Sequence, residues 1–304
     1  MTQDMPTSPG VLDARWGRSG AIRFEERFGG SVALLTTVHG TAVVALQGAQ
    51  VLSFVPAGGD EVLWLSPVAR LGTGQAVRGG VPVCWPWFGP NADDPKKPAH
   101  GFVRAAMWDV TGTEVTRDGA SIRLQFDATK IDPTLWSHAA VATIQVTLSD
   151  CLEISLTTEN SGSAPLSVTQ ALHTYLAVGD VSGIMIDGLA GRPYIDQLAP
   201  GTRPIQHGII KISGEFDRIY QQTPDTVIVH DSHLKRRLRV TKTGSASTVV
   251  WNPGSEKAAR LGDMGTDGYR GMVCIETANA GDDVVTLAHG GRHLLTTRIA
   301  VETA

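Results

Sequence analysis

Cysteine, long apolar runs and positive charge are all scarce in this sequence. Cys84, Cys151 and Cys274 stand far apart in 304 residues, which excludes a disulfide framework and a cysteine-rich zinc site and predicts reduced, mostly buried thiols. No stretch approaches the roughly 18 consecutive apolar residues of a membrane-spanning helix, so we expect no membrane partner. Lys and Arg number 26 against 30 Asp and Glu, a net charge of −4. Without a basic excess to neutralise a phosphate backbone, we expect no nucleic-acid partner.

The first twenty residues differ in composition from the rest of the chain. They are rich in Thr, Ser, Pro, Gly and Arg, show no sustained periodicity, and lack the basic and apolar regions of a signal peptide. We therefore expect a cytoplasmic protein with a loose extension at 1–20. No polar linker or shift in composition divides the remainder, so 21–304 is predicted to be one domain. Exposed patches cannot be told from core strands in the sequence, and a monomer is the expectation.

Beyond this extension, apolar and polar residues alternate with the period of two that is typical of a strand with one buried face. The clearest such strands are expected at 121–126, 151–157, 237–241 and 293–301. Continuous apolar or β-branched runs predict strands buried on both faces at 41–46, 140–148 and 284–287. Helical periodicity is scarce, and 34 Gly with 16 Pro favour many turns. The fold class predicted is all-β, a large antiparallel β-sandwich.

Several standard catalytic motifs are absent. The sequence has no phosphate loop of the form GxxxxGK[ST], no GxSxG nucleophile elbow, no HExxH metal helix and no complete dinucleotide-binding glycine loop. The histidine pairs His230 with His233 and His289 with His293 raise the question of a metal. No carboxylate or cysteine accompanies them in a known ligand pattern. We expect no metal site and no cofactor.

Two unusual segments lie in the first third of the chain. Residues 78–89 read RGGVPVCWPWFG, in which prolines remove backbone donors and aromatics supply flat apolar walls. This segment is either one rigid side of a cleft or a packed core loop. Residues 98–104 then place His100 and Arg104 four positions apart, next to Gly101, which allows close backbone approach.

Two further segments carry candidate acids and bases. His173 lies within the apolar stretch ALHTYL, where a satisfied core histidine is the ordinary explanation. Glu276 ends the apolar run MVCIE, and a glutamate is rarely buried unless it is paired or used. Asp217 with Arg218 is a weaker signal, because a surface ion pair explains it equally well.

These segments, taken in order, resemble the glucose-6-phosphate 1-epimerase family, or hexose-6-phosphate mutarotases, within the aldose 1-epimerase superfamily. The resemblance runs from about Thr36 to about Val301 and is carried by QGA at 47–49, LWLS, RGGVPVCWPWFG, HGFVR, LHTYL, FDRIY, WNP and CIETAN. It implies a many-stranded β-sandwich with an open cleft on one sheet. This agrees with the period of two.

The resemblance also implies an activity and a catalytic pair. At matching positions the family's catalytic glutamate is Glu276 and its catalytic histidine is His173. The family interconverts the α and β anomers of a hexose 6-phosphate by opening and reclosing the sugar ring, without a metal or redox cofactor. At reference pKa values of about 4.3 for Glu and about 6.5 for His, an ionised carboxylate and a protonated imidazole coexist near neutral pH. We expect the two groups to titrate as a coupled pair.

Four more residues receive binding roles from the resemblance. Arg78 and Arg104 match phosphate-binding arginines, Asp217 matches a contact to sugar hydroxyls, and His100 lies at the cleft. The planar fork of arginine suits phosphate oxygens. At Ala99 some relatives carry a glutamine that reaches the ligand, which leaves the exact sugar preference open.

Two alternatives to a sugar-phosphate isomerase stay open. A regulatory protein could bind a sugar phosphate without turning it over, although the presence of both Glu276 and His173 disfavours this. A mutarotase for unphosphorylated aldoses is disfavoured by Arg78 and Arg104, because burying two guanidiniums without an anion is costly.

Overall fold

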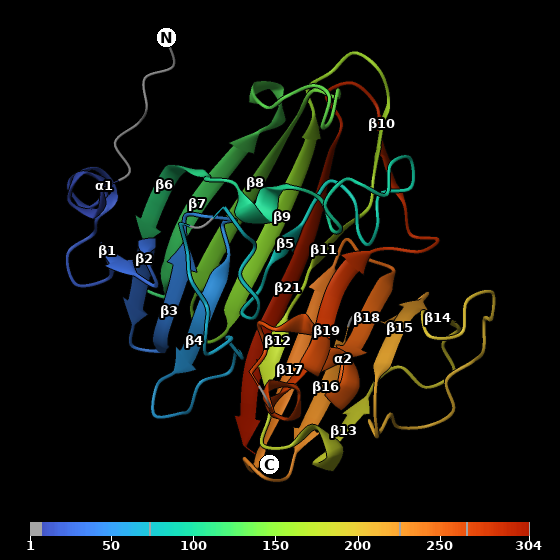
Figure 1. The fold of residues 1–304 in the computed structure, drawn as a ribbon. Helices are drawn as coiled ribbons and strands as arrows, with labels where there is room; N and C mark the ends of the chain where they lie inside the picture. Colours follow the sequence, from blue (N-terminus) through green and yellow to red (C-terminus); the bar gives the residue numbers. More distant parts are fainter. Residues whose placement is uncertain (1–7, 73, 225, 266, 304) are drawn as a thin grey trace.

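The computed structural model of the protein describes residues 8–72, 74–224, 226–265 and 267–303, and it consists mainly of antiparallel β-sheets (Figure 1). Residues 1–7 of the expected extension lie outside the described residues. The rest of that stretch contains helix α1 (Pro9–Trp16), whose only buried side chain is Leu12. The division into an extension and a single domain stays a prediction.

The largest sheet has eight strands. In spatial order they are β13 (Ile184–Asp187), β16 (Thr226–Asp231), β17 (Arg236–Thr243), β21 (Arg292–Thr303), β9 (Leu152–Asn160), β8 (Ala140–Leu148), β7 (Ala120–Asp127) and β6 (Asp109–Val115). Each strand pairs antiparallel with its neighbour. The four strands predicted from alternation, at 121–126, 151–157, 237–241 and 293–301, all lie in this sheet, which confirms them.

The second large sheet has seven strands and carries the residues of the candidate site. Its main path is β14 (Tyr194–Asp196), β15 (Phe216–Gln221), β18 (Ser247–Asn252), β19 (Met272–Asn279), β11 (Gln170–Leu172) and β5 (Val83–Cys84), and β12 (Tyr175–Ala177) also pairs with β19. Side chains on its inner face, such as Val250 and Ile275, share one continuous apolar core with Ile144 and Leu238 of the eight-stranded sheet. The two sheets therefore form the layers of a sandwich.

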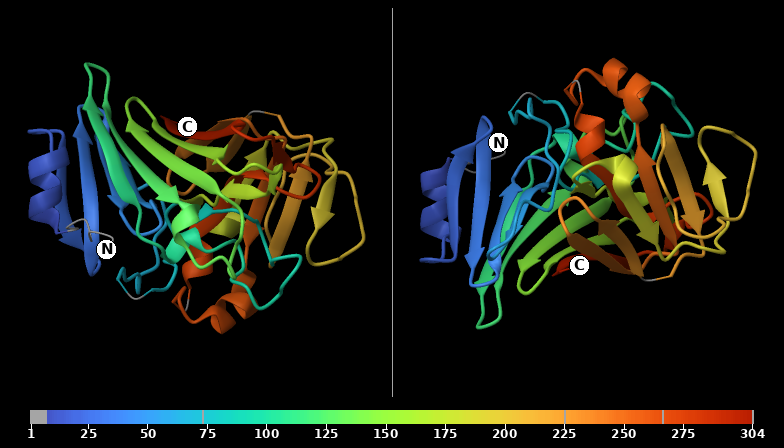
Figure 2. Two further views of the ribbon diagram at one scale, coloured as in Figure 1. Left: turned by 90° about the horizontal axis from the view of Figure 1, so that it is seen from above. Right: turned by 90° about the horizontal axis from the view of Figure 1, so that it is seen from below.

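Smaller elements complete the fold. A four-stranded sheet joins β1 (Ile22–Arg27), β2 (Gly30–Thr37), β3 (Gly40–Ala45) and β4 (Val51–Pro56), and β10 (Leu166–Val168) pairs with β20 (Val285–Leu287). The helices besides α1 are α2 (Gly254–Leu261) and the 3-10 turns η1 (Val103–Ala105), η2 (Ala128–Lys130), η3 (Val181–Gly183) and η4 (Gly268–Gly271). Figure 2 shows α1 and the four-stranded sheet on one side of the molecule and β14 on the opposite side.

The expected burial of two strands on both faces is wrong. Burial in β8 alternates strictly, with Ile144 buried and Thr143 and Gln145 partly exposed, because these outward residues lie on the face of the sheet away from the core. In β20 the middle residue, Thr286, is exposed, since this strand pairs only with β10. The run at 41–46, by contrast, overlaps β3, which is buried at five of its six positions.

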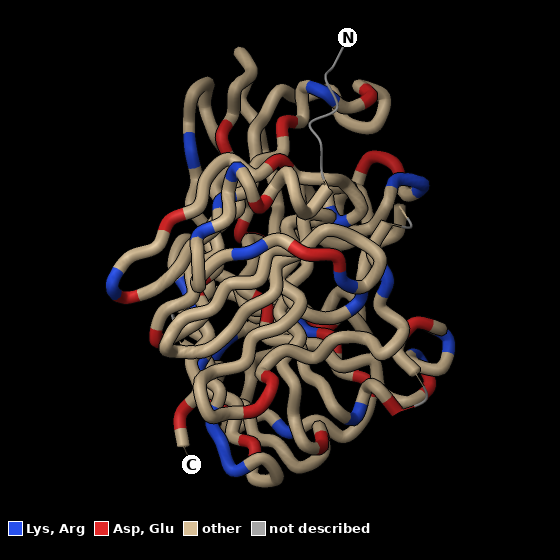
Figure 3. Tube along the Cα trace, turned by 90° about the vertical axis from the view of Figure 1, so that its left-hand side faces the viewer, with Lys and Arg blue, Asp and Glu red and all other residues tan. Residues whose placement is uncertain are grey.

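The described residues include no helix long and apolar enough to cross a membrane. Lysines and arginines are interspersed with acidic residues along the chain in the view of Figure 3, without a region of one sign.

Candidate active site

Glu276 owes its place to the alternation of β19. Val273 and Ile275 point into the core between the sheets, whereas Cys274 and Ala278 belong to an apolar cluster on the opposite face. Glu276 lies between these two residues in the period of two and so shares their face. Its side chain is only 1% exposed. The sequence therefore places a nearly fully buried carboxyl on the outer face of a sheet.

His173 lies between β11 and β12, opposite this carboxyl. Its backbone N–H donates to the carbonyl of Pro82 at 2.9 Å. The imidazole stacks on the ring of Tyr175, with centroids 4.7 Å apart and planes 9° apart, and meets the edge of Trp251. These contacts fix the ring so that His173 Nε2 is 3.4 Å from Glu276 Oε1. The imidazole of His173 and the carboxyl of Glu276 therefore face each other, and the packed rings of Tyr175 and Trp251 hold the imidazole in place.

The surroundings of this pair act against the expected charges. Burial lowers the pKa of His173 well below its usual value, and nearby His100, Arg104 and Arg78 lower it further. Burial, with a smaller effect from Asp217, raises the pKa of Glu276 well above its usual value. Both shifts favour the neutral forms, a carboxyl facing a neutral imidazole, because a low-dielectric site disfavours charge.

Three polar atoms at the site lack a hydrogen-bond partner among the described residues. They are His173 Nδ1, Glu276 Oε2 and Arg104 Nε, and each is buried. Buried polar atoms in folded proteins are nearly always paired. Their convergence here identifies a site prepared for the polar groups of a ligand.

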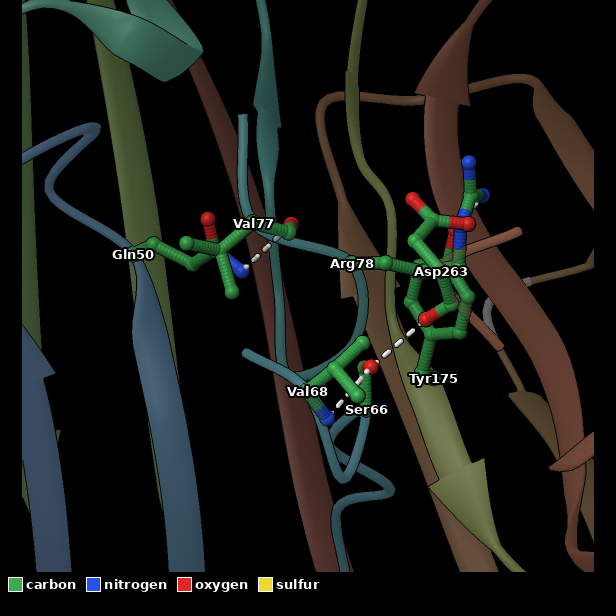
Figure 4. A network of polar contacts seen from close by, with 7 residues as sticks. All are labelled: Gln50, Ser66, Val68, Val77, Arg78, Tyr175 and Asp263. Atoms are coloured by element: carbon green, nitrogen blue, oxygen red, sulfur yellow. Dashed lines mark hydrogen bonds and ion pairs between the residues drawn. The ribbon is translucent and has the colours of Figure 1, made fainter. Parts of the chain in front are cut away.

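Arg78 enters the cleft from the loop before β5. Its Nε donates to Asp263 Oδ1 at 2.6 Å and its Nη1 donates to the hydroxyl of Tyr175 at 3.3 Å (Figure 4). Ser66 Oγ in turn donates to the backbone carbonyl of Asp263. Gln50 secures the same loop by donating to the carbonyls of residues 77 and 79. The two ends of the segment, at Arg78 and Phe88, line the cleft, whereas Val81, Val83 and Trp85 between them are buried in the core, so each of the two interpretations describes part of it.

Arg104 and His100 come from the neighbouring loop. Gly101 permits close approach of the backbone, as predicted, since a Cβ there would be 1.8 Å from the carbonyl oxygen of Trp85. Arg104 Nη2 donates to the carbonyl of Ala99, so this departure from the family pattern still contributes its backbone to the site. His100 Nδ1 accepts the N–H of Gly89, which leaves Nε2 as the protonated nitrogen. Burial, with Arg104 and Arg78, lowers the pKa of His100 to about 3 and keeps it neutral.

Asp217 on β15 faces the cleft from the other side. Lys257 of α2 lies 3.7 Å from Asp217 Oδ2 and 2.8 Å from Glu215 Oε1. Burial raises the pKa of Asp217 to about 6, while Lys257 acts against this shift and Glu215 and Asp196 add to it. Asp217 therefore changes charge close to physiological pH.

All six residues singled out in the sequence line one cleft of about 370 Å³, a size that suits a small ligand. The sequence gave no role to four other residues here: Tyr175, Trp251 and Lys257, which line the cleft, and Asp263, which holds Arg78. Tyr175 and Trp251 lie within the LHTYL and WNP motifs. Lys257 and Asp263 lie outside these motifs, and the sequence gave no signal for either of them.

One group of side chains at the site could hold a metal ion. A ligand atom of His173, one of Cys274 and one of Glu276 all lie within 4.8 Å of one another, and all three residues are buried. The histidine pairs considered in the sequence form no such group within the described ranges. Imidazole, thiolate and carboxylate are the donors that zinc sites use.

Fold and cleft together define a β-sandwich protein whose site is equipped for acid–base chemistry on a small polar ligand. The sequence profile of aldose 1-epimerase matches residues 32–300, and the chain belongs to the aldose 1-epimerase family. An Escherichia coli K12 protein provisionally named glucose-6-phosphate 1-epimerase is 37% identical over 242 residues, which cover 79% of this chain and 80% of the relative. A protein of the same provisional name from Cenchrus ciliaris is 32% identical, covering 82% and 78%.

Solved structures agree with this assignment. The crystal structure of a protein from Salmonella typhimurium, provisionally called a mutarotase, superposes with a TM-score of 0.87 at 30% identity and covers 94% of this chain and 95% of its own. A galactose mutarotase-like protein from Clostridium acetobutylicum, at 15% identity and a TM-score of 0.76, shares the fold. The predicted β-sandwich and the family resemblance are thereby confirmed.

Proposed function

We propose that this protein is a hexose-6-phosphate mutarotase, a glucose-6-phosphate 1-epimerase that interconverts the α and β anomers of glucose 6-phosphate and related aldohexose 6-phosphates. The observation that carries the proposal is the pairing of His173 with Glu276, 3.4 Å apart, in a cleft that two guanidiniums also line. The provisional names of the relatives support the same substrate class.

In the proposed reaction, Glu276 and His173 act as base and acid on a closed sugar ring. The carboxylate of Glu276 takes the proton of the hydroxyl on C1, the C1–O5 bond breaks as the carbonyl forms, and the imidazolium of His173 gives its proton to O5. The open aldehyde turns by half a revolution about the C1–C2 bond. Reclosure with the roles reversed attacks the other face of the carbonyl and forms the other anomer.

The protonation states of the pair suit this cycle. Before ring opening the pair is carboxylate with imidazolium, and after it is carboxyl with neutral imidazole, so the pair holds one proton and no net charge in both states. A buried site therefore never gains an uncompensated charge during the reaction, which would be costly. Burial favours the neutral form in the free protein, which is the form needed to reclose an open ring.

The remaining residues would bind and orient the sugar phosphate. Arg78 and Arg104 supply N–H groups for a phosphate dianion, and neutral His100 offers one N–H from Nε2. Asp217, when ionised, accepts hydrogen bonds from ring hydroxyls. Tyr175 and Trp251 supply apolar ring surface beside the catalytic imidazole.

Anomer exchange measured by proton NMR on the native protein tests the proposal. We expect exchange of glucose 6-phosphate well above its spontaneous rate and little effect on glucose. Equal acceleration of both sugars would favour a mutarotase for unphosphorylated aldoses. Saturable binding of glucose 6-phosphate without acceleration would favour a regulatory binding protein. Either result would overturn the proposal.

A further inference from the structure

Cys274 has no part in the proposed reaction, yet it lies beside both catalytic residues. It precedes Glu276 by two positions on β19 and therefore faces the same side of the sheet. Its sulfur, a ring nitrogen of His173 and a carboxylate oxygen of Glu276 fall within 4.8 Å of one another. Two of these side chains each keep a buried polar atom without a hydrogen-bond partner among the described residues. Three side chains of the kinds that bind zinc therefore lie together at a place where buried polar atoms have no hydrogen-bond partner within the described ranges.

The distances fit an ion after a small adjustment. Zinc bonds lie at about 2.3 Å to sulfur and about 2.0–2.2 Å to nitrogen or oxygen, so two donors of a tetrahedral ion are about 3.3–3.7 Å apart. Nε2 of His173 and Oε1 of Glu276, 3.4 Å apart, already have this spacing, and donors that are up to 4.8 Å apart must approach by up to about 1.5 Å. His173 and Glu276 both line the open cleft, which gives an ion its approach and leaves a fourth position for water or a ligand oxygen.

Charge balance favours a divalent ion with affinity for sulfur. Arg78 and Arg104 repel any cation that stays uncompensated, whereas a thiolate and a carboxylate together cancel the two charges of Zn²⁺. Binding releases two protons, one from the thiol and one from the pair that His173 and Glu276 share, so the occupied site gains no net charge. Mg²⁺ prefers oxygen ligands and waters, and it finds only one carboxylate here.

We propose that His173, Cys274 and Glu276 form an inhibitory site for a thiophilic divalent cation, of which Zn²⁺ is the physiological example. The bound ion occupies the base and the acid of the reaction, so it excludes turnover and competes with sugar phosphate. Ion binding stands on the geometry alone, whereas the inhibition rests on the proposed mutarotase activity. The site would make the enzyme sensitive to free zinc.

Cobalt titration tests the binding without any activity measurement. Co²⁺ replaces Zn²⁺ at such sites and, when bound to a thiolate, gives a sulfur-to-cobalt charge-transfer absorption. We expect this absorption to saturate at one ion per chain in the native protein and in Cys151→Ala, which removes a thiol just before β9 of the other large sheet. Cys274→Ala should lose it. Glucose 6-phosphate should displace the ion where the same concentration of inorganic phosphate displaces less.

Anomer exchange gives the second measurement. Zn²⁺, but not Mg²⁺, should inhibit the native protein and Cys151→Ala, and a chelator should restore the rate. Cys274→Ala should retain its basal activity, with the inhibitory zinc concentration raised at least about tenfold, since even outer-shell partners change metal affinity about 10–100-fold. Cys274→Ser, which keeps the side-chain size, serves if the alanine variant fails to fold.

The outcomes separate this proposal from the proposed function. A native protein with mutarotase activity but no cobalt–sulfur absorption would overturn the metal site alone. An absorption that persists in Cys274→Ala or Cys274→Ser and disappears in Cys151→Ala would overturn it as well. Cobalt binding through Cys274 in a protein without mutarotase activity would support the site and overturn the function.

Discussion

Arg78 is held on two sides before any ligand binds. Asp263 and Tyr175 engage two of its five N–H groups, and the loop that carries it is anchored by Gln50. Because this guanidinium is already fixed, it loses little conformational entropy when an anion binds. The free energy of its hydrogen bonds to the anion therefore goes almost wholly into binding affinity. Its negative neighbour also limits the affinity, which suits an enzyme that must release its product.

We expect Arg78→Ala to weaken substrate binding rather than chemistry. Charge-assisted hydrogen bonds contribute about 1.5–3 kcal/mol, so the KM for glucose 6-phosphate should rise about 10- to 150-fold while kcat changes little. Anomer-exchange kinetics measure both. Arg123→Ala, which removes an exposed guanidinium on the eight-stranded sheet, is the matched control and should leave both constants unchanged. A fall in kcat at constant KM would contradict the binding role.

Asp217 predicts a pH dependence of substrate binding. Its pKa of about 6 means that it is ionised above this pH and accepts hydroxyl hydrogen bonds, and that it is protonated below it and loses them. The KM for glucose 6-phosphate should therefore rise as pH falls through about 6. The phosphate itself titrates with a pKa of about 6, so its contribution must be separated.

The variant Asp217→Asn provides this separation, because only the phosphate then titrates. Between about pH 7 and pH 5 the native KM should rise more steeply than that of the variant. Burial raises the pKa of Asp217, and its charged neighbours Lys257, Glu215 and Asp196 modify that shift; all three neighbours remain in place in the variant. Equal slopes for the two proteins would contradict the role given to Asp217.

At the level of elements, the positions of the strands could be predicted from the sequence, but which of their faces are buried could be predicted only in part. The alternation of apolar and polar residues located β7, β9, β17 and β21, because a strand with one buried face carries apolar residues at every second position. It failed for β8, where β-branched residues on both faces imitate a fully buried strand. It also missed α2, because eight residues are too few to establish helical periodicity.

The corrected assignment of β8 makes a prediction about stability. Ile144→Ala creates a cavity in the core between the sheets and should lower the free energy of unfolding by about 2–5 kcal/mol. Thr143→Ala, one position away on the outer face, should change it by less than about 0.5 kcal/mol. Urea denaturation with unchanged m-values measures both. Equal losses would indicate that both faces of β8 are buried.

The candidate site could not be predicted from the pattern of apolar and polar residues alone. The sequence marked Glu276 as a suspicious acid, but its partner His173 lies about a hundred residues earlier, and only the pairing of β12 and β11 with β19 brings the two together. Family resemblance supplied that connection. The protonation of the pair could not be predicted from reference pKa values, because it depends on burial that the fold creates.

At the level of the whole molecule, a net charge of −4 coexists with a cleft that two arginines line. Acidic and basic residues are interspersed over the chain, so the long-range field neither gathers nor strongly repels an anion (Figure 3). Recognition of a phosphate must then be local, through guanidiniums fixed by the loops that cover the outer face of one sheet. The sandwich serves as a rigid frame that brings these loops to the catalytic pair.

The rate of anomer exchange of glucose 6-phosphate in Glu276→Gln tests the central claim most directly. The amide keeps the shape of the side chain but cannot take up the proton of the C1 hydroxyl. Proton NMR should show kcat lowered about 10²- to 10⁴-fold relative to the native protein, with KM little changed. Exchange at the native rate would contradict the acid–base pair and with it the proposed function.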